Sequence, residues 1–213
     1  MMKKFVLAIA VLATVVVSQN RLAWAGGEKK NYYPMKEGNK WTYEVSLEKV
    51  TKKGKTTNKK VGETTFHIGK IEKEGDLELG KVEAKVKDAL VGTEHLANTD
   101  EGLFRHKING IEISNPVKLL QYPVKKDEEW EGEFEVTGMM GKYEVKVLST
   151  KDKITVPAGK YKAVKIQLKV YATGETTETI YWFAPDVGMV KQRISISPRE
   201  TLTLKLMKAD LPK

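Results

Sequence analysis

The 213-residue chain contains no cysteine. This absence excludes disulfide bonds, zinc sites with thiolate ligands and thiol nucleophiles. It also excludes the lipid attachment of a bacterial lipoprotein, which needs a cysteine just after the export signal. We therefore expect a soluble mature protein whose stability comes from the burial of apolar side chains.

Reactive motifs are missing as well. There is no Gly-x-Ser-x-Gly elbow, no His-Glu-x-x-His helix and no phosphate-binding glycine loop. The three histidines, His67, His95 and His106, lie far apart, so we expect neither a metal site nor a cofactor. The many carboxylates fall mostly on the polar positions of predicted strands, where solubility explains them. We expect a protein that is not an enzyme; a periplasmic hydrolase is the third of three functional alternatives.

Long apolar runs are absent except at the N-terminus. A basic start at Lys3 and Lys4 precedes the apolar residues 5–17, and Ala23-Trp24-Ala25 offers small residues for cleavage. This order is typical of a secretory signal peptide. We predict a signal peptide at residues 1–25, a single domain at 26–213, export to the periplasm or the extracellular space, and no stable membrane span after cleavage. An uncleaved anchor is the alternative.

The net charge is +9, and it becomes +6 if Lys3, Lys4 and Arg21 leave with the signal. Lysines alternate with glutamates over most of the chain, which offsets the positive potential locally. Residues 49–60 are the one strongly basic segment, and we interpret them as a solvated hairpin tip, with a role at an anionic surface as the alternative. We expect no nucleic-acid partner, because the aromatic residues share the apolar positions of their strands.

Helical periodicity is scarce, and apolar residues instead occupy every second position over most of the chain. In the segment 162–171, Val164, Ile166 and Leu168 alternate with Lys165 and Gln167. Such alternation predicts strands with one buried and one wetted face. Roughly ten or eleven strands joined by Gly, Asn, Asp and Pro turns predict an all-β, mainly antiparallel fold: one strongly curved meander sheet or a partly open barrel. We interpret residues 113–126, which contain two prolines, as a short helix or a connection over one end of the sheet.

The apolar face of this sheet is the candidate binding surface. If the sheet closes only partly, its concave side can hold a lipid or another apolar small molecule. The alternative is a core that its own side chains fill. The candidate ligand-binding residues are the large aromatic side chains of that face: Trp41, Tyr43, Phe66, Trp130, Phe134 and Trp182.

Three motifs, taken together, resemble those of the TapB-like exported bacterial proteins of unknown function. They are Tyr32-Tyr33-Pro34, followed by residues 38–43; Val156-Pro157-Ala158-Gly159; and residues 181–191, which contain Ala184-Pro185-Asp186-Val187-Gly188. Asp186 stands where that group usually has glycine. The resemblance implies a strongly curved antiparallel sheet, similar to the open barrels of periplasmic lipoprotein carriers, and no established reaction.

These observations favour an exported, non-enzymatic β-protein that binds a lipid or apolar small molecule. The second alternative is a structural or assembly component that pairs with other cell-envelope proteins through an edge strand.

Overall fold

A computed structural model describes residues 30–212, so the predicted signal peptide and its cleavage site lie outside the described residues. The described chain forms twelve strands: β1 (Lys40–Val50), β2 (Thr56–Glu74), β3 (Leu77–Val86), β4 (Ala89–Asn98), β5 (Gly102–Ile108), β6 (Ile111–Gln121), β7 (Glu129–Val136), β8 (Met139–Val156), β9 (Gly159–Ala172), β10 (Glu175–Ala184), β11 (Gly188–Ser197) and β12 (Glu200–Asp210). No helix within residues 30–212 is long and apolar enough to cross a membrane.

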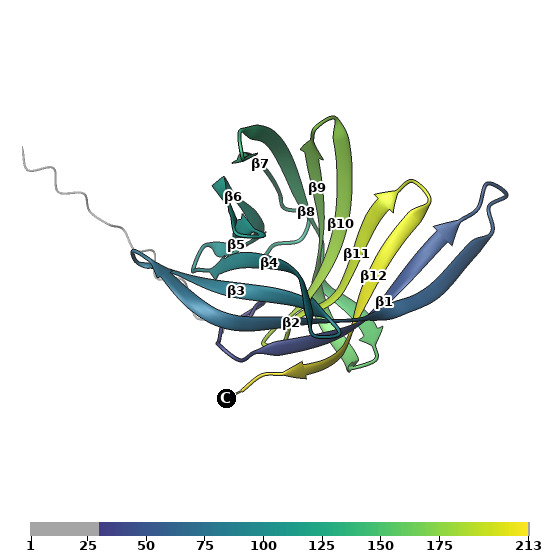
Figure 1. Cartoon of the computed structure of the whole chain (residues 1–213), viewed down its shortest axis with the longest axis horizontal. Coiled ribbons are helices and arrows are strands. Elements are labelled where there is room, and N and C mark those ends of the chain that lie inside the picture. Colours follow the sequence, from purple (N-terminus) through teal and green to yellow (C-terminus); the bar gives the residue numbers. More distant parts are fainter. Residues whose placement is uncertain (1–29, 213) are drawn as a thin grey trace, which may run out of the picture.

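The strands form one antiparallel sheet in the order β6-β5-β4-β3-β2-β1-β12-β11-β10-β9-β8-β7. Sequential hairpins therefore build the two halves of the sheet, and the pairing of β1 with β12 joins the halves. The sheet curls until its edge strands, β6 and β7, approach each other, which gives a nearly closed barrel (Figure 1). The predicted all-β meander is confirmed, with twelve strands in place of the ten or eleven expected.

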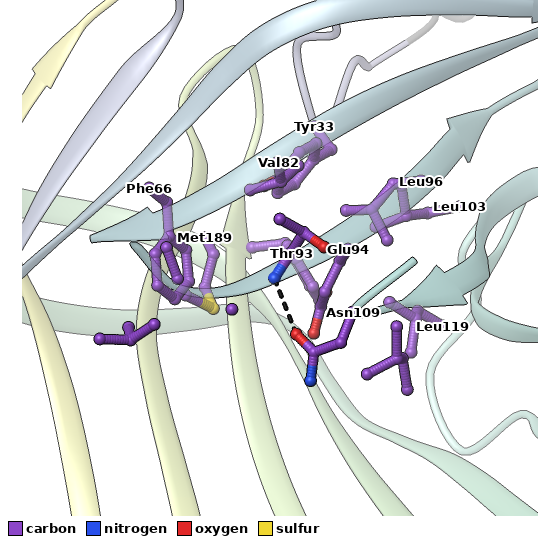
Figure 2. Close-up of a pocket in the computed structure, with 15 residues that line it drawn as sticks. Tyr33, Phe66, Val82, Thr93, Glu94, Leu96, Leu103, Asn109, Leu119 and Met189 are labelled. Carbon is purple, nitrogen blue, oxygen red and sulfur yellow. Dashed lines mark hydrogen bonds between the residues drawn. The ribbon is translucent and has the colours of Figure 1, made fainter. Parts of the chain in front are cut away.

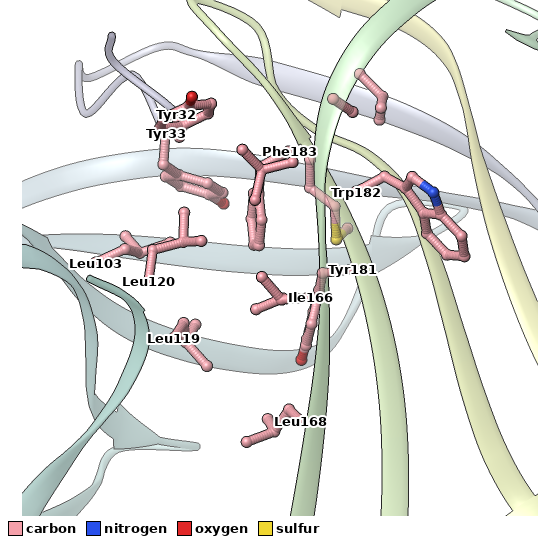
Figure 3. Close-up of a cluster of buried hydrophobic side chains, with 14 of the residues drawn as sticks. Tyr32, Tyr33, Leu103, Leu119, Leu120, Ile166, Leu168, Tyr181, Trp182 and Phe183 are labelled. Atoms are coloured by element: carbon pink, nitrogen blue, oxygen red, sulfur yellow. The ribbon is translucent and has the colours of Figure 1, made fainter. Parts of the chain in front are cut away.

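The alternation in β9 has the predicted consequence. Val164, Ile166 and Leu168 are at most 2% exposed, whereas Lys165 between them is partly open to solvent. Figure 3 shows Ile166 and Leu168 pointing into the same interior as Leu119, Leu120 and Phe183. The buried side chains of this interior form the core of the barrel.

One end of the barrel is closed by the segment that precedes β1. Tyr33 packs against Trp41 and Phe183, with ring centroids 5.3 Å and 6.5 Å apart. The Asn98 side-chain amide donates a hydrogen bond of 2.8 Å to the Tyr33 carbonyl, and the Asp186 N–H donates one to the Asn31 carbonyl. The Tyr-Tyr-Pro motif is therefore a plug that crosses the turns β4–β5 and β10–β11.

The turn after β10 tolerates aspartate in the place of glycine. Asp186 has φ +61°, in the left-handed region that aspartate enters more readily than most residues. Gly188, two residues later, has φ +98°, and its α-carbon faces the Trp41 indole closely enough that a β-carbon would lie 3.2 Å from Nε1. Glycine thus lets the turn approach the plugged end of the barrel.

The interpretation of residues 113–126 as a helix or a connection is wrong for most of this range, because residues up to Gln121 belong to β6. Pro116 lies within this strand. A proline cannot donate a ladder hydrogen bond, but an edge strand has an unpaired side on which no donor is required. β6 pairs only with β5, so this position accepts proline.

Candidate functional site

A cavity of about 230 Å³ lies inside the barrel, mainly between β2–β6 and the plug. Its lining is predominantly apolar, and Figure 2 shows side chains from both walls converging on it. The lining residues are Tyr33, Phe66, Val82, Ala84, Val91, Gly92, Thr93, Glu94, Leu96, Leu103, Ile108, Asn109, Leu119, Phe183 and Met189.

The cavity runs from the plug to a mouth beside the tips of two adjacent hairpins. Tyr33, Leu103 and Phe183, at its deep end, are buried. Val91 and Ile108, at its outer end, are 60% and 37% exposed, and they lie beside the turns β3–β4 and β5–β6. The cavity therefore opens to solvent at the end of the barrel opposite the plug.

A small polar group lies near the mouth. The Thr93 N–H donates a hydrogen bond of 3.0 Å to Oδ1 of Asn109, and the Asn109 N–H donates to the Thr93 carbonyl (Figure 2). Asn109 has φ +51° in the turn β5–β6, a conformation that asparagine adopts readily. These bonds hold the two hairpin tips together and fix the shape of the mouth.

An arginine points into the barrel beside this polar group. Nη2 of Arg105 on β5 lies 3.2 Å from a carboxylate oxygen of Glu94 and donates a hydrogen bond of 3.3 Å to the Tyr181 hydroxyl on β10, across the interior. Its Nε is buried and has no partner within residues 30–212. Burial lowers the pKa of Arg105, but the adjacent Glu94 carboxylate outweighs this effect, so the pKa is raised overall and the guanidinium stays charged. Glu94 therefore lines the cavity as the acidic partner of an ion pair with Arg105 that carries no net charge.

The predicted aromatic set falls at different places in the barrel. Phe66 lines the cavity, and Tyr43 packs behind it with ring centroids 5.1 Å apart. Burial raises the pKa of the Tyr43 hydroxyl well above its ordinary value, and this hydroxyl donates a hydrogen bond of 2.8 Å to the Met189 carbonyl. Trp41 lies at the plugged end, where its indole N–H donates to the Val187 carbonyl.

Two further aromatic residues of the predicted set lie on the edge strand β7. Trp130 and Phe134 on β7 are half-buried and pack against the core, but neither lines the cavity. Phe134 covers Gly141 of β8, where a β-carbon would lie 2.4 Å from the ring. These two residues form part of the barrel wall near the gap between the edge strands β6 and β7.

The interpretation of Trp182 as a residue of the concave side is wrong. Its neighbours Tyr181 and Phe183 face the interior, and Figure 3 shows Trp182 pointing away from them. The indole lies between Lys165 and Lys191, whose ammonium groups are 5.2 Å and 4.6 Å from the ring centroid. Its N–H donates a 2.7 Å hydrogen bond to Asp152 on β8, which bends over the outer face.

Sequence reasoning missed the polar residues of the interior, Glu94 and Arg105, and most of the aliphatic lining. One signal was available. Arg105 lies two residues after the apolar Leu103 on a short strand, so its charged side chain points to the same, inward face. Within residues 30–212, no three His, Asp or Glu side chains cluster so as to hold a metal ion.

Comparison with known proteins gives likeness in fold only. No family model matches the chain, and no curated protein matches it. A "putative lipoprotein" from Parabacteroides distasonis ATCC 8503 has TM-score 0.52 and 13% identity, over 86% of this chain and 100% of that one. A "putative exported protein with YmcC-like fold" from Bacteroides fragilis NCTC 9343 has TM-score 0.51 and 13% identity, over the same shares. The chain therefore shares its nearly closed antiparallel barrel with bacterial proteins that are described as lipoproteins or exported proteins.

Proposed function

We propose that this protein is an exported, non-enzymatic carrier that binds one apolar chain, such as an acyl chain, inside the barrel. The observation that carries the proposal is the apolar cavity of about 230 Å³ with one open end. Apolar cavities of about 150 Å³ already bind benzene, so this space accepts an apolar guest. It lies below the roughly 300 Å³ at which typical ligand sites begin, which favours a single chain over a whole membrane lipid.

The closed end supports the same proposal. Tyr33 and Phe183 form an apolar floor, and the aliphatic walls lead from it to the mouth. An acyl chain that enters from the mouth would leave its polar end near Thr93, Glu94 and Asn109, where solvent is accessible. We place the protein in the periplasm or outside the cell, in line with the bacterial lipoprotein and exported protein that share the fold. From its three motifs we also propose that it belongs with the TapB-like exported proteins.

Pairing with an envelope protein through an edge strand has less support. The edge strands β6 and β7 face each other, and the side chains of Trp130 and Tyr143 already bond the backbone of β6 at Lys118. An added strand would have to displace these bonds.

The proposal is tested by filling the cavity. Ala84 on β3 lines the cavity, whereas Ala89 on β4 is exposed and does not. We expect Ala84→Phe to weaken binding of a fluorescent fatty acid by at least about tenfold, because a phenyl ring occupies the guest's space. Ala89→Phe is the matched control and should bind like the wild type. Thermal unfolding establishes that both variants are folded.

Organic extraction of protein purified from its native envelope, followed by mass spectrometry, gives an independent test. A co-purifying acyl compound that Ala84→Phe lacks supports the proposal. A wild-type protein that neither carries nor binds any acyl compound overturns it.

A further inference from the structure

The large apolar side chains that residues 30–212 leave exposed are concentrated at one end of the strands. There are nine such side chains, and the ninth, Val61, lies on β2 away from the others. The remaining eight lie within a few residues of the turns β3–β4, β5–β6, β7–β8 and β11–β12: Val86, Leu90, Val91, Ile108, Ile111, Met139, Met140 and Ile196. Because alternate turns of an antiparallel meander share one edge of the sheet, these residues belong to the end opposite the plug.

Five of these residues lie on two neighbouring hairpins, and we call them the apolar lip: Val86, Leu90, Val91, Ile108 and Ile111. They lie on two hairpins that pair directly, since Glu94 of β4 is opposite Ile108 of β5. Leu90 and Val91 are 56% and 60% exposed. Several exposed apolar side chains gathered at one end of a sheet mark an interaction surface in soluble proteins. The lip also borders the cavity mouth, because Val91 and Ile108 belong to both.

The next hairpin along the same edge, β1–β2, is basic and extends past the lip, because β2 pairs with β3 only from Thr65 onward. The turn β1–β2 follows β3–β4 in the sheet order, and Figure 1 shows this hairpin extending beyond its neighbours. Residues 50–62 contain five lysines and no acidic residue. Within that range only Lys60 forms an ion pair in the described structure, with Glu44 and Glu63. Lys52, Lys53, Lys55 and Lys59 thus carry uncompensated positive charge.

We propose that this end of the barrel docks on an anionic phospholipid membrane. The apolar lip inserts at the level of the headgroups, and the β1–β2 lysines bind the surrounding lipid phosphates. Apolar side chains flanked by basic residues are the combination that binds membrane interfaces. Lys87 and Asp88, in the turn of the lip itself, offset each other and leave the insertion zone close to neutral. Docking in this orientation places the cavity mouth against the bilayer.

Vesicle co-sedimentation tests the docking. We expect the wild type to bind phosphatidylcholine vesicles that contain phosphatidylglycerol, and to bind pure phosphatidylcholine vesicles much more weakly. The variant Leu90→Gln/Val91→Gln should partition roughly tenfold more weakly for each side chain changed, with either vesicle. Each of Lys52→Gln, Lys53→Gln and Lys55→Gln should cost about fivefold, and only with phosphatidylglycerol present. All these positions are exposed, so the variants should fold.

Leu77→Gln is the control, because Leu77 is a partly exposed apolar residue beside the turn β2–β3, at the plugged end of the barrel. It should bind vesicles like the wild type. Ala84→Phe should also bind vesicles normally, so loss of the acyl-chain site and loss of docking are separable.

Three outcomes overturn the docking proposal. The wild type fails to bind phosphatidylglycerol vesicles, the lip variant binds them as well as the wild type, or the lip proves to be buried against another protein. In the last case, size-exclusion chromatography would show a dimer or a complex that Leu90→Gln/Val91→Gln dissociates.

Discussion

The Trp130 indole N–H donates a hydrogen bond of 2.8 Å to the carbonyl oxygen of Lys118, across the gap between the edge strands β7 and β6. The Tyr143 hydroxyl accepts a second bond, of 3.3 Å, from the Lys118 N–H. β6 and β7 share no backbone ladder. Side chains therefore take the place of backbone pairing at the seam, and they satisfy both polar groups of one edge residue.

This relationship predicts the effect of Trp130→Phe. The variant keeps an aromatic ring but leaves the Lys118 carbonyl without its donor, so we expect a loss of about 1 kcal/mol in the free energy of unfolding. We also expect faster amide hydrogen exchange in β6, because the seam opens more often. Denaturant titration and hydrogen-exchange mass spectrometry measure the two effects.

Tyr161→Phe is the control for Trp130→Phe, because it removes a donor to the Ala158 carbonyl far from the seam. It should reduce stability with no change in β6 exchange. Equal exchange in β6 for wild type and Trp130→Phe would contradict the role of the seam bond.

The sequence was sufficient to predict the β-sheet, because two-residue alternation reports directly which face of a strand is buried. Val164 and Ile166 show this. The same rule failed at Trp182, which lies in the run Ile180–Ala184, where successive residues are all apolar. Most of that run is buried. β8 covers the outer face of this run and the barrel core covers its inner face. Because both faces are apolar, the alternation of residues could not show to which face Trp182 points.

The cavity was not predictable in the same way. Its walls combine Phe66, Leu119 and Met189, which lie on β2, β6 and β11. Their meeting depends on how far the sheet curls, and curvature is not encoded in the parity of any one strand. The strand containing Pro116 was missed for a related reason. A proline argues against a central strand, and only the observed edge position makes it acceptable.

The Arg105–Glu94 pair predicts an asymmetry between two variants. The Arg105 side chain is 13% exposed and the Glu94 side chain 40% exposed. Glu94→Met leaves a nearly buried guanidinium without its partner, so we expect a loss of about 3 kcal/mol in the free energy of unfolding. Arg105→Met leaves a carboxylate that solvent can still hydrate, so we expect about 1 kcal/mol.

The double variant Glu94→Met/Arg105→Met should lose less stability than the sum of the two single losses, because it leaves no unpaired charge. Urea unfolding of the four proteins gives the complete cycle. A loss for Arg105→Met equal to or larger than that for Glu94→Met would contradict the asymmetry.

A substitution at Gly132 should be destabilising although alanine generally suits a strand better than glycine. A β-carbon on Gly132 would lie 2.6 Å from the Tyr143 ring, which packs over this glycine from the neighbouring strand. Moving the ring also breaks the bond between Tyr143 and Lys118 at the seam. We expect Gly132→Ala to lose roughly 2 kcal/mol or more in the free energy of unfolding.

Gly138, in the turn β7–β8, is the comparison for Gly132. It has φ +79° and open space around it, so Gly138→Ala carries only the backbone cost of about 1 kcal/mol. Chemical denaturation of both variants decides the order. A Gly132→Ala variant that is as stable as the wild type would show that Tyr143 can move without loss.

Stability should fall on acidification because of His95. The residue is 5% exposed, its Nδ1 is buried without a partner in the described structure, and its Nε2 lies 3.3 Å from Glu72. Burial lowers the pKa of His95 below its ordinary value of 6.5, and the nearby Glu72 offsets this only in part. The unfolded chain therefore takes up the proton first, and stability declines as pH falls from above 6.5 towards the folded-state pKa.

His95→Gln removes this titration, so its unfolding free energy should vary less than that of the wild type between about pH 8 and about pH 5. Burial also lowers the pKa of His106, so the wild-type slope contains two contributions, and His106→Gln should remove only its own part. Urea titrations at several pH values measure the slopes. If His95→Gln kept the full wild-type slope, the pKa of His95 would be the same in the folded and the unfolded chain, and His95 would not cause the loss of stability in acid.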